Sequence, residues 1–183
     1  DKFIFISSDK SVRPTNIMGA SKRLAELSLL YFNSISNLDK NKKTKFSLVR
    51  FGNVLESSGS VVPLFKNQIL KGGPITITHP DINRFFMSIE EASLLVMQSC
   101  YLTEGGEIFL LDMGKPIKIT DLAHKMVKLA GLSIKNTSNL AGDIEINFIG
   151  LRPGEKLYEE LLIDDKSVKT QHPYIYKSIE NKL

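Results

Sequence analysis

The chain opens with a continuous apolar run at residues 3–6, with the sequence FIFI, and this run constrains the fold more than any other feature. Such a run is typical of a strand buried on both faces of a parallel sheet. Apolar residues then recur at helical spacing over 17–35, and a second strand is predicted at 46–51. A strand, a helix and a strand joined by a long crossover form a βαβ unit, so an α/β fold with a parallel sheet is predicted.

The first predicted strand lies almost at the first residue, although a strand buried on both faces needs neighbours within its sheet. The chain also starts with Asp1 rather than with methionine. We therefore expect the chain to begin in the middle of a fold.

Helical and strand patterns continue along the rest of the chain, without an internal repeat. Helices are predicted at 61–70 and at 156–162. Another is predicted to follow Ser88, which begins a capping box, and a further one to run from Thr120, as N-cap, to Gly131. The predicted strands lie at 75–78, 107–112 and 144–149. The tail after residue 164 shows no clear period.

The composition excludes several classes of protein. Hydrophobic residues at 42% and charged residues at 24% are ordinary globular values, which exclude disordered and fibrous chains. The single Cys100 excludes a disulfide framework, and no spacing of the histidines predicts a metal site. The lysines at 40–45 contribute to a net charge of +4, but no aromatic residues interleave them, so a solvated loop is favoured over a nucleic-acid site.

Polar residues follow the first strand at 7–10, with the sequence SSDK, where open α/β sheets bind ligands. Asp9 and Lys10 are adjacent titratable groups of opposite type, suited to moving protons. Met18 and Lys22 are four residues apart, so they share a helix face that points back toward the strand end. On these pairs alone, a turn capped by Asp9 and a solvated Lys22 would be the simpler interpretation.

The complete string of motifs resembles the nucleotide-sugar 4,6-dehydratases of bacterial polysaccharide biosynthesis, within the extended short-chain dehydrogenase/reductase superfamily. The resemblance covers about residues 1–163, in order and at plausible spacing. It is carried by SSDK at 7–10, RPTNIMGASKR at 13–23, VRFGNV at 49–54, SGSVVPLF at 58–65, NRFFM at 83–87, LDMG at 111–114 and GLRPGEK at 150–156.

One position departs from the usual superfamily pattern. Most members carry Tyr-x-x-x-Lys, whose tyrosine exchanges a proton with the substrate, and here Met18 occupies the tyrosine position. Methionine has no titratable proton, so proton transfer by a tyrosine is impossible at this site. The large, membrane-anchored branch of these dehydratases carries this methionine, so the resemblance favours that branch over the soluble, inverting one.

The resemblance implies a set of catalytic residues, Ser8, Asp9, Lys10, Met18 and Lys22. It implies that Asp9 is the acid at the leaving C6 hydroxyl, that Lys10 is the C5 base and that Ser8 hydrogen-bonds near O4. Lys10 would need a depressed pKa to act as a base near neutral pH.

The resemblance also implies residues that bind cofactor and substrate. NAD, rather than NADP, would contact Ser7, Lys22 and Phe51, with Lys22 at the nicotinamide ribose. Asn53 would contact the diphosphate, and guanidinium groups suit phosphates, which fits Arg84 and Arg152. Glu155 would accept hydrogen bonds from ribose hydroxyls. Without the accompanying motifs, surface ion pairs and a simple turn would explain these last residues.

A dinucleotide enzyme of this class carries a glycine-rich turn after its first strand, and none of the 12 glycines forms one. We therefore expect the C-terminal portion of a longer protein whose N-terminal cofactor half is absent. Residues 1–75 would be the C-terminal part of a Rossmann-type domain, 76–163 mainly a small α/β sugar-nucleotide-binding subdomain, and 164–183 a tail.

The predicted activity is NAD-dependent dehydration of a UDP-N-acetylhexosamine, UDP-N-acetylglucosamine above all, to a 4-keto-6-deoxy sugar. The alternatives are a nucleotide-sugar epimerase and a non-catalytic sugar-nucleotide-binding fragment. We expect the isolated chain to be inactive. The whole protein would be a homo-oligomer at the cytoplasmic face of the bacterial inner membrane, anchored through the upstream segment.

Overall fold

The computed structural model describes residues 1–38, 44–57, 59–162 and 166–180, and it has an α/β fold. The chain divides into two compact units. The first unit comprises Asp1–Gly52, Glu90–Gly114 and Glu159–Leu183, and the second comprises Asn53–Ile89 and Lys115–Tyr158. The sequence predicts a division near residues 75 and 163 with interleaved strands between the two parts. In the structure each unit consists of separate segments of the chain, because later segments return to complete the sheet of the first unit.

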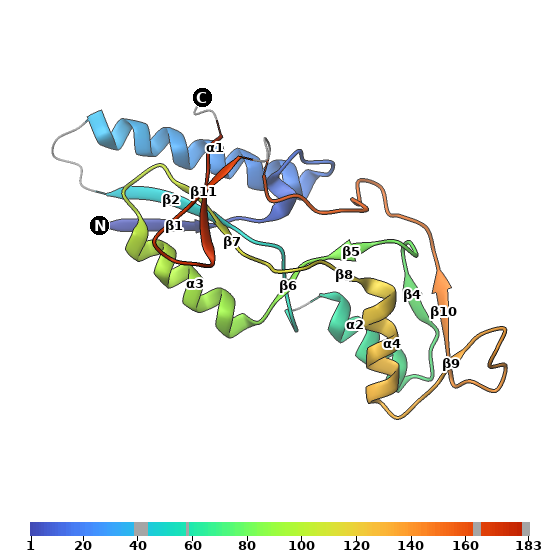
Figure 1. The fold of residues 1–183 in the computed structure, drawn as a ribbon. Helices are drawn as coiled ribbons and strands as arrows, with labels where there is room; N and C mark the ends of the chain where they lie inside the picture. Colours follow the sequence, from blue (N-terminus) through green and yellow to red (C-terminus); the bar gives the residue numbers. More distant parts are fainter. Residues whose placement is uncertain (39–43, 58, 163–165, 181–183) are drawn as a thin grey trace. The chain divides into compact units, whose positions relative to one another are not determined.

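The first unit contains a five-stranded sheet among the described residues, in the order β1-β2-β7-β12-β11. The first three strands run parallel, and β12 and β11 continue the sheet antiparallel. Helices α1 and α3 lie on opposite faces of this sheet (Figure 1). The elements are β1 (Lys2–Ile6), α1 (Ile17–Leu38), β2 (Lys45–Arg50), α3 (Ile89–Leu102), β7 (Ile108–Leu111), β11 (Ser167–Lys169) and β12 (Ile175–Ser178).

The βαβ prediction is confirmed, because β1 pairs in parallel with β2 and the connection between them contains α1. Leu48 of β2 and Leu29 of α1 pack in one apolar cluster with Ile108 of β7. The expected burial of β1 on both faces is wrong in this structure. Its Phe3 and Ile6 are 47% and 49% exposed, because β1 lies at the edge of the sheet.

The second unit packs two helices against short strands. Its largest sheet is β4-β10-β9, and two-stranded ladders join β3 with β6 and β5 with β8. Phe65 of α2, Ile75 of β4 and Ala123 of α4 belong to one buried apolar core. The elements are β3 (Asn53–Val54), α2 (Val61–Leu70), β4 (Ile75–Ile77), β5 (Asn83–Arg84), β6 (Phe86–Met87), β8 (Ile117–Lys118), α4 (Ile119–Leu129), β9 (Ile134–Lys135) and β10 (Ile144–Phe148).

Several predictions of local structure are corrected by the structure. Residues 156–162 form no helix, because the carbonyls of Lys156 and Leu157 accept hydrogen bonds from Arg84 of β5 instead of from a following helical turn. Helix α4 has Lys118 rather than Thr120 as its N-cap. The tail supplies β11 and β12. The predicted lysine loop at 40–45 lies mostly outside the described residues.

None of the helices formed by the described residues combines the length and the apolar character that crossing a bilayer needs.

Candidate active site

The turn after β1 places three polar side chains within hydrogen-bonding distance of one another. Ser8 is the N-cap of a short 3₁₀ helix, η1 (Asp9–Ser11). Its hydroxyl donates to Asp9 Oδ1 at 2.5 Å, and the backbone N–H of Lys10 donates to the same oxygen at 2.9 Å. The Lys10 ammonium adds a third donor to Asp9 Oδ1 at 3.0 Å. Asp9 is therefore held as a buried carboxyl with one crowded oxygen.

A second carboxyl, at the start of the last segment of the first unit, contacts the Lys10 ammonium. Glu159 Oε1 accepts a hydrogen bond from Lys10 Nζ at 3.1 Å, and the Glu159 side chain is only 4% exposed. Two buried carboxyl groups therefore flank one ammonium group. No local motif marks Glu159, because its partner Lys10 lies 149 positions away in the sequence.

The electrostatics of this cluster stabilise an ion pair. Burial raises the pKa of Asp9, but a hydrogen bond with Glu159, the charge of Lys10 and the hydroxyl of Ser8 outweigh it, so the pKa of Asp9 is lowered. Burial lowers the pKa of Lys10, but the charges of Asp9 and Glu159 outweigh it, so the pKa of Lys10 is raised. The depressed pKa that a Lys10 base requires is therefore not present in this resting arrangement.

A buried ionic network supports the turn from below. Glu26 of α1 accepts hydrogen bonds from the hydroxyls of Ser7 and Ser11, at 2.5 and 2.6 Å, so both ends of the turn are fixed to α1. Arg50 of β2 binds Glu26 through Nε and Nη2, at 2.8 Å each. Glu180 also contacts Arg50, as an ion pair. The predicted cofactor contact Ser7 therefore uses its hydroxyl within this network.

The N-terminal turn of α1 comes close to η1. Gly19 is buried, and a Cβ at this position would lie 2.2 Å from the backbone oxygen of Lys10, so only glycine allows this approach. Met18 is 48% exposed. Lys22 Nζ donates to the Ile6 carbonyl at 3.1 Å and lies 4.9 Å from the centroid of the Phe5 ring. Met18 and Lys22 thus lie on the helix that also carries Glu26, and Lys22 reaches the end of β1.

The predicted cofactor residue Phe51 contributes through its backbone. Its carbonyl accepts a hydrogen bond from the N–H of Asp9 at 3.3 Å, directly after β2. The structure therefore brings Ser7, Ser8, Asp9, Lys10 and Phe51 together at the carboxyl ends of β1 and β2. This edge of a parallel sheet is where α/β proteins bind ligands.

Two of the predicted substrate residues bind each other in the second unit. Arg84 Nη2 lies 3.4 Å from Glu155 Oε1 and also donates to the carbonyl of residue 156, while Nη1 donates to the carbonyls of residues 83 and 157. Glu155 also accepts hydrogen bonds from Thr78 Oγ1 at 3.1 Å and from the Arg152 N–H at 3.1 Å. The Arg84–Glu155 pair therefore shapes the loop 150–157.

The other two predicted substrate residues, Asn53 and Arg152, lie at the start of a strand and in an exposed turn. Asn53 begins β3, and its N–H donates to the Phe85 carbonyl at 3.1 Å. Arg152 is exposed at the start of the turn that Glu155 closes. These residues belong to the second unit, whereas the Asp9–Lys10 pair belongs to the first.

The comparison with known protein families shows to which family the chain belongs. A family model described as "Polysaccharide biosynthesis protein" matches residues 1–180. The chain belongs to this family. This confirms the resemblance inferred from the sequence motifs.

Curated relatives of this polysaccharide biosynthesis protein include sugar-nucleotide enzymes. The capsular polysaccharide biosynthesis protein CapD of Staphylococcus aureus is 56% identical over 161 residues, which are 88% of this chain and 25% of CapD. A UDP-N-acetylglucosamine 4,6-dehydratase (inverting) of Campylobacter jejuni is 36% identical over all of this chain and 49% of its own length. A UDP-glucose 4-epimerase of Rickettsia bellii is also 36% identical, over 93% of this chain and 46% of its own. The chain thus spans between a quarter and a half of these relatives.

Solved structures confirm the Rossmann-type α/β fold of this family member. The crystal structure of Pen from Bacillus thuringiensis matches with a TM-score of 0.80 at 37% identity, over 96% of this chain and 51% of that one. More distant matches, at 14% and 15% identity, include dTDP-glucose 4,6-dehydratases that were solved with NAD. At that identity they establish the fold alone.

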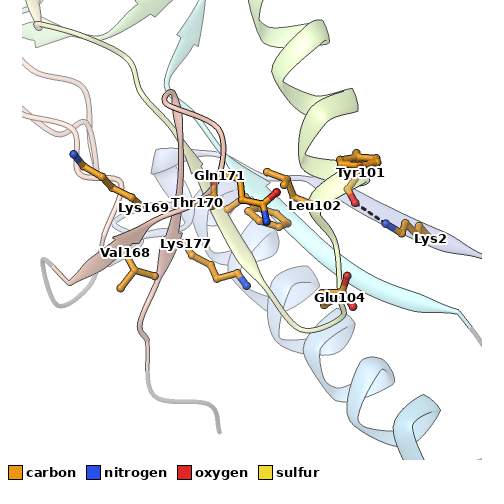
Figure 2. Close-up of a pocket in the computed structure, with 10 residues that line it drawn as sticks. Lys2, Tyr101, Leu102, Glu104, Val168, Lys169, Thr170, Gln171 and Lys177 are labelled. Atoms are coloured by element: carbon orange, nitrogen blue, oxygen red, sulfur yellow. Dashed lines mark hydrogen bonds between the residues drawn. The ribbon is translucent and has the colours of Figure 1, made fainter.

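A cavity of about 870 Å³ in the first unit lies apart from the Asp9–Lys10 pair (Figure 2). Lys2, at the opposite end of β1 from Asp9, donates there to the Tyr101 carbonyl at 2.7 Å. Lys177 lies 3.5 Å from Glu107, so two of the cavity's lysines are already engaged. The lining residues are Lys2, Tyr101, Leu102, Glu104, Phe109, Val168, Lys169, Thr170, Gln171 and Lys177. None of the residues predicted from the polysaccharide biosynthesis motifs contributes to it.

Within residues 1–38, 44–57, 59–162 and 166–180, no three His, Cys, Asp or Glu side chains are grouped so that they could hold a metal ion.

Proposed function

We propose that this chain carries the proton-transfer residues of an NAD-dependent nucleotide-sugar 4,6-dehydratase of polysaccharide biosynthesis. The substrate we propose is UDP-N-acetylglucosamine, and the product is the 4-keto-6-deoxy sugar. The observation that carries the proposal is the ion pair between the buried Asp9 carboxyl and the partly exposed Lys10 ammonium. The two groups lie 3.0 Å apart at the carboxyl end of β1, beside the helix of Met18 and Lys22. An acid and a base on adjacent residues suit the removal of water from neighbouring carbon atoms.

The chemistry sets clear requirements for these side chains. When NAD is bound, it would supply a hydride acceptor for C4 of the sugar and later return the hydride to C6. A ketone at C4 acidifies the C5 proton, which Lys10 would take. Asp9 would give a proton to the C6 hydroxyl, so that it leaves as water, and Ser8 would hydrogen-bond near O4.

The resting ion pair must first be converted into a base and an acid. With Lys10 protonated and Asp9 ionised, the pair can do neither task, so one proton has to move from Lys10 to Asp9. The elimination then returns that proton balance, because Lys10 gains the C5 proton while Asp9 loses one to the leaving hydroxyl. When the hydride returns to C6, Lys10 would give a proton to C5, and the proton released from O4 in the oxidation at C4 would restore Lys10 by way of solvent, so that the cycle balances.

The residues at the end of β1 fit a nicotinamide ribose. Lys22 is held there by the Ile6 carbonyl and the Phe5 ring, with Met18 partly exposed on the same helix. A cation at this place would donate to ribose hydroxyls and stabilise the charge that develops at O4. The methionine leaves all proton transfer to the Asp9–Lys10 turn.

We assign recognition of the diphosphate to the second unit. Arg152 is an exposed guanidinium, and Asn53 starts a strand, so both are proposed to contact the substrate diphosphate. Arg84 and Glu155 would act by holding the loop that presents Arg152, since they bind each other and that loop's backbone. The names of the relatives support a UDP-sugar.

Incubating the full-length protein with NAD and UDP-N-acetylglucosamine in deuterated water tests the proposal. A dehydratase gives a 4-keto-6-deoxy product with solvent deuterium at C5, which mass spectrometry and NMR detect. An unchanged sugar that nevertheless binds would show a non-catalytic binding module instead.

A nucleotide-sugar epimerase is the second candidate, because an epimerase is as identical to this chain as the dehydratase is. It would give a C4-inverted sugar that keeps its C6 oxygen. It is disfavoured by Met18 at the tyrosine position of the superfamily together with the Asp9–Lys10 pair, since an acid and a base on adjacent residues suit a dehydration, whereas inversion at C4 expels no leaving group.

We also propose, from the resemblance, that the whole protein is a homo-oligomer held at the cytoplasmic face of the membrane. Fractionation of cells and sedimentation of the detergent-solubilised protein test this. A monomer found in the supernatant would contradict it.

A further inference from the structure

Glu180 follows strand β12, and its carboxyl belongs to the buried ionic network below the turn after β1. The side chain is only 7% exposed. Its Oε2 accepts hydrogen bonds from Arg50 Nη2 at 3.1 Å and from Arg23 Nη1 at 3.3 Å, and its Oε1 accepts one from Arg50 Nη1. One carboxyl group near the end of the chain therefore binds two guanidinium groups.

Glu26 of α1 binds the same two arginines. Its Oε2 accepts hydrogen bonds from Arg50 Nη2 at 2.8 Å and from Arg23 Nη1 at 2.9 Å. The network thus contains two carboxylates and two guanidinium groups, and no other charged side chain among the described residues binds any of the four. Because Arg50 and Glu26 are fully buried, removal of one charge from this balanced set is costly.

Glu26 connects these charges to the turn after β1. Its Oε1 accepts hydrogen bonds from the hydroxyls of Ser7 and Ser11, at 2.5 and 2.6 Å, and from Arg50 Nε at 2.8 Å. Ser7 and Ser11 flank the proposed proton-transfer residues in the sequence. A displacement of the Glu26 carboxyl would therefore move both ends of the turn, and Glu180 can act on the turn in this indirect way.

We propose that Glu180 is a positioning residue of the active site, which sets the geometry of the proton-transfer turn by balancing the two arginines around Glu26. Without the Glu180 carboxylate, two guanidinium groups would share the single carboxylate of Glu26. Their mutual repulsion would pull Glu26 away from the hydroxyls of Ser7 and Ser11. The segment after β12 thus completes the site without touching the substrate. The inference rests on the proposed dehydratase function.

The kinetic test compares Glu180→Gln with Glu104→Gln in the full-length protein. Glutamine keeps the size of the side chain but removes its charge, so kcat of Glu180→Gln should fall by about 10- to 100-fold as the turn is misplaced. The KM for UDP-N-acetylglucosamine should stay within about twofold, and Glu180→Asp should restore part of kcat. Glu104 forms an exposed pair with Lys45 in the same unit, so Glu104→Gln should behave as wild type. Equal kcat values for the two glutamine variants would overturn the proposal.

A second substitution separates charge balance from a general loss of structure. In the double variant Glu180→Gln/Arg23→Met, one guanidinium group, that of Arg50, again faces one carboxylate, that of Glu26. Its kcat should therefore be at least about threefold higher than that of Glu180→Gln alone. Two substitutions that act only by weakening the fold would add their losses. A double variant that is no faster than Glu180→Gln would overturn the proposal.

Hydrogen exchange tests the positioning role without requiring turnover. The Asp9 N–H donates to the Phe51 carbonyl within the turn, whereas the Leu48 N–H donates to the Glu107 carbonyl inside the sheet of the same unit. In Glu180→Gln, exchange should accelerate by a larger factor at Asp9 than at Leu48, because the turn loosens before the sheet opens. The same factor at both amides would show a general loss of stability, and the inference fails. If exchange behaves as expected but the wild-type protein gives no dehydration, the positioning role stands and the proposed reaction is wrong.

Discussion

Arg50 binds both carboxylate oxygens of Glu26, from Nε to Oε1 and from Nη2 to Oε2, at 2.8 Å each, and both side chains are fully buried. This paired geometry joins β2 to α1 directly below the turn that carries Asp9. The ion pair therefore fixes the relative position of the strand and the helix that present the candidate catalytic residues.

Replacing Arg50 with methionine should strongly destabilise the protein. Arg50→Met leaves the buried carboxylates of Glu26 and Glu180 with Arg23 as their remaining cation, and breaking a buried pair in this way costs about 3–5 kcal/mol. Denaturant unfolding measures the change in the free energy of unfolding. As a control, Lys45→Met breaks an exposed pair with Glu104, which solvent screens, and should change the free energy of unfolding far less. Similar losses in both variants would contradict the buried network.

The stability of the first unit should depend on pH through Glu26. Burial raises the pKa of Glu26, but the hydrogen bonds and charge of Arg50 outweigh it, so the pKa is lowered from its ordinary value of 4.5. A lowered carboxyl pKa stabilises the fold above the unfolded value, and this contribution is lost as the pH falls through the folded value. The unfolding free energy of wild type minus that of Glu26→Gln should therefore be largest above pH 4.5 and shrink below it. A difference that is constant with pH would refute this.

A methyl group at Gly19 should disturb the active-site turn. In Gly19→Ala the new Cβ would meet the Lys10 carbonyl at 2.2 Å, so α1 or the turn must move, at a cost of about 1–3 kcal/mol. Gly142→Ala is a matched control, because its Cβ would meet the Ile134 carbonyl at 2.4 Å in the second unit. Both variants should lose stability in thermal unfolding, but only Gly19→Ala should lower kcat. The same kcat in the two variants would count against the role of this close approach.

Met18 should be replaceable by another apolar side chain. Met18→Leu keeps a similar volume and likewise has no proton to give, so kcat should remain within about threefold of wild type. Steady-state kinetics with the full-length protein measure this. A fall of about 100-fold would assign the thioether a direct role in the reaction.

Lys10 should be indispensable for turnover but not for nucleotide binding. Lys10→Ala removes the proposed C5 base, so kcat should fall by about 100-fold or more, while calorimetry should show unchanged affinity for UDP. Lys125→Ala, at an exposed position on α4, is the control and should behave as wild type. Near-normal turnover of Lys10→Ala would remove Lys10 from the mechanism.

Local sequence signals were sufficient for the βαβ core and for the position of the polar turn after β1. The apolar run at 3–6 and the helical period after residue 17 depend on neighbouring residues, and β1 and α1 lie where these patterns predict them. The motif SSDK likewise marked the turn that buries Asp9.

Long-range pairings explain what the sequence could not predict. The carboxyl of Glu159 accepts a hydrogen bond from Lys10, and the carbonyls of Lys156 and Leu157 accept hydrogen bonds from Arg84. These partners lie far apart in the sequence. Strand β12 has few apolar residues and is stabilised by its ladder with β7. The expectation that the Lys10 ammonium needs negatively charged partners was the signal that could have pointed to the glutamates at 159 and 160.

The interleaving of the two units sets the order in which a growing polypeptide can satisfy its own contacts. During translation Arg50 is added early, whereas Glu180, which contacts the same guanidinium, is added 130 residues later. The second unit has all of its segments once Tyr158 has been added, but the first unit is still missing the strand that extends its sheet beyond β7. Translation therefore supplies every segment of the second unit before the sheet of the first unit can gain β12 and β11.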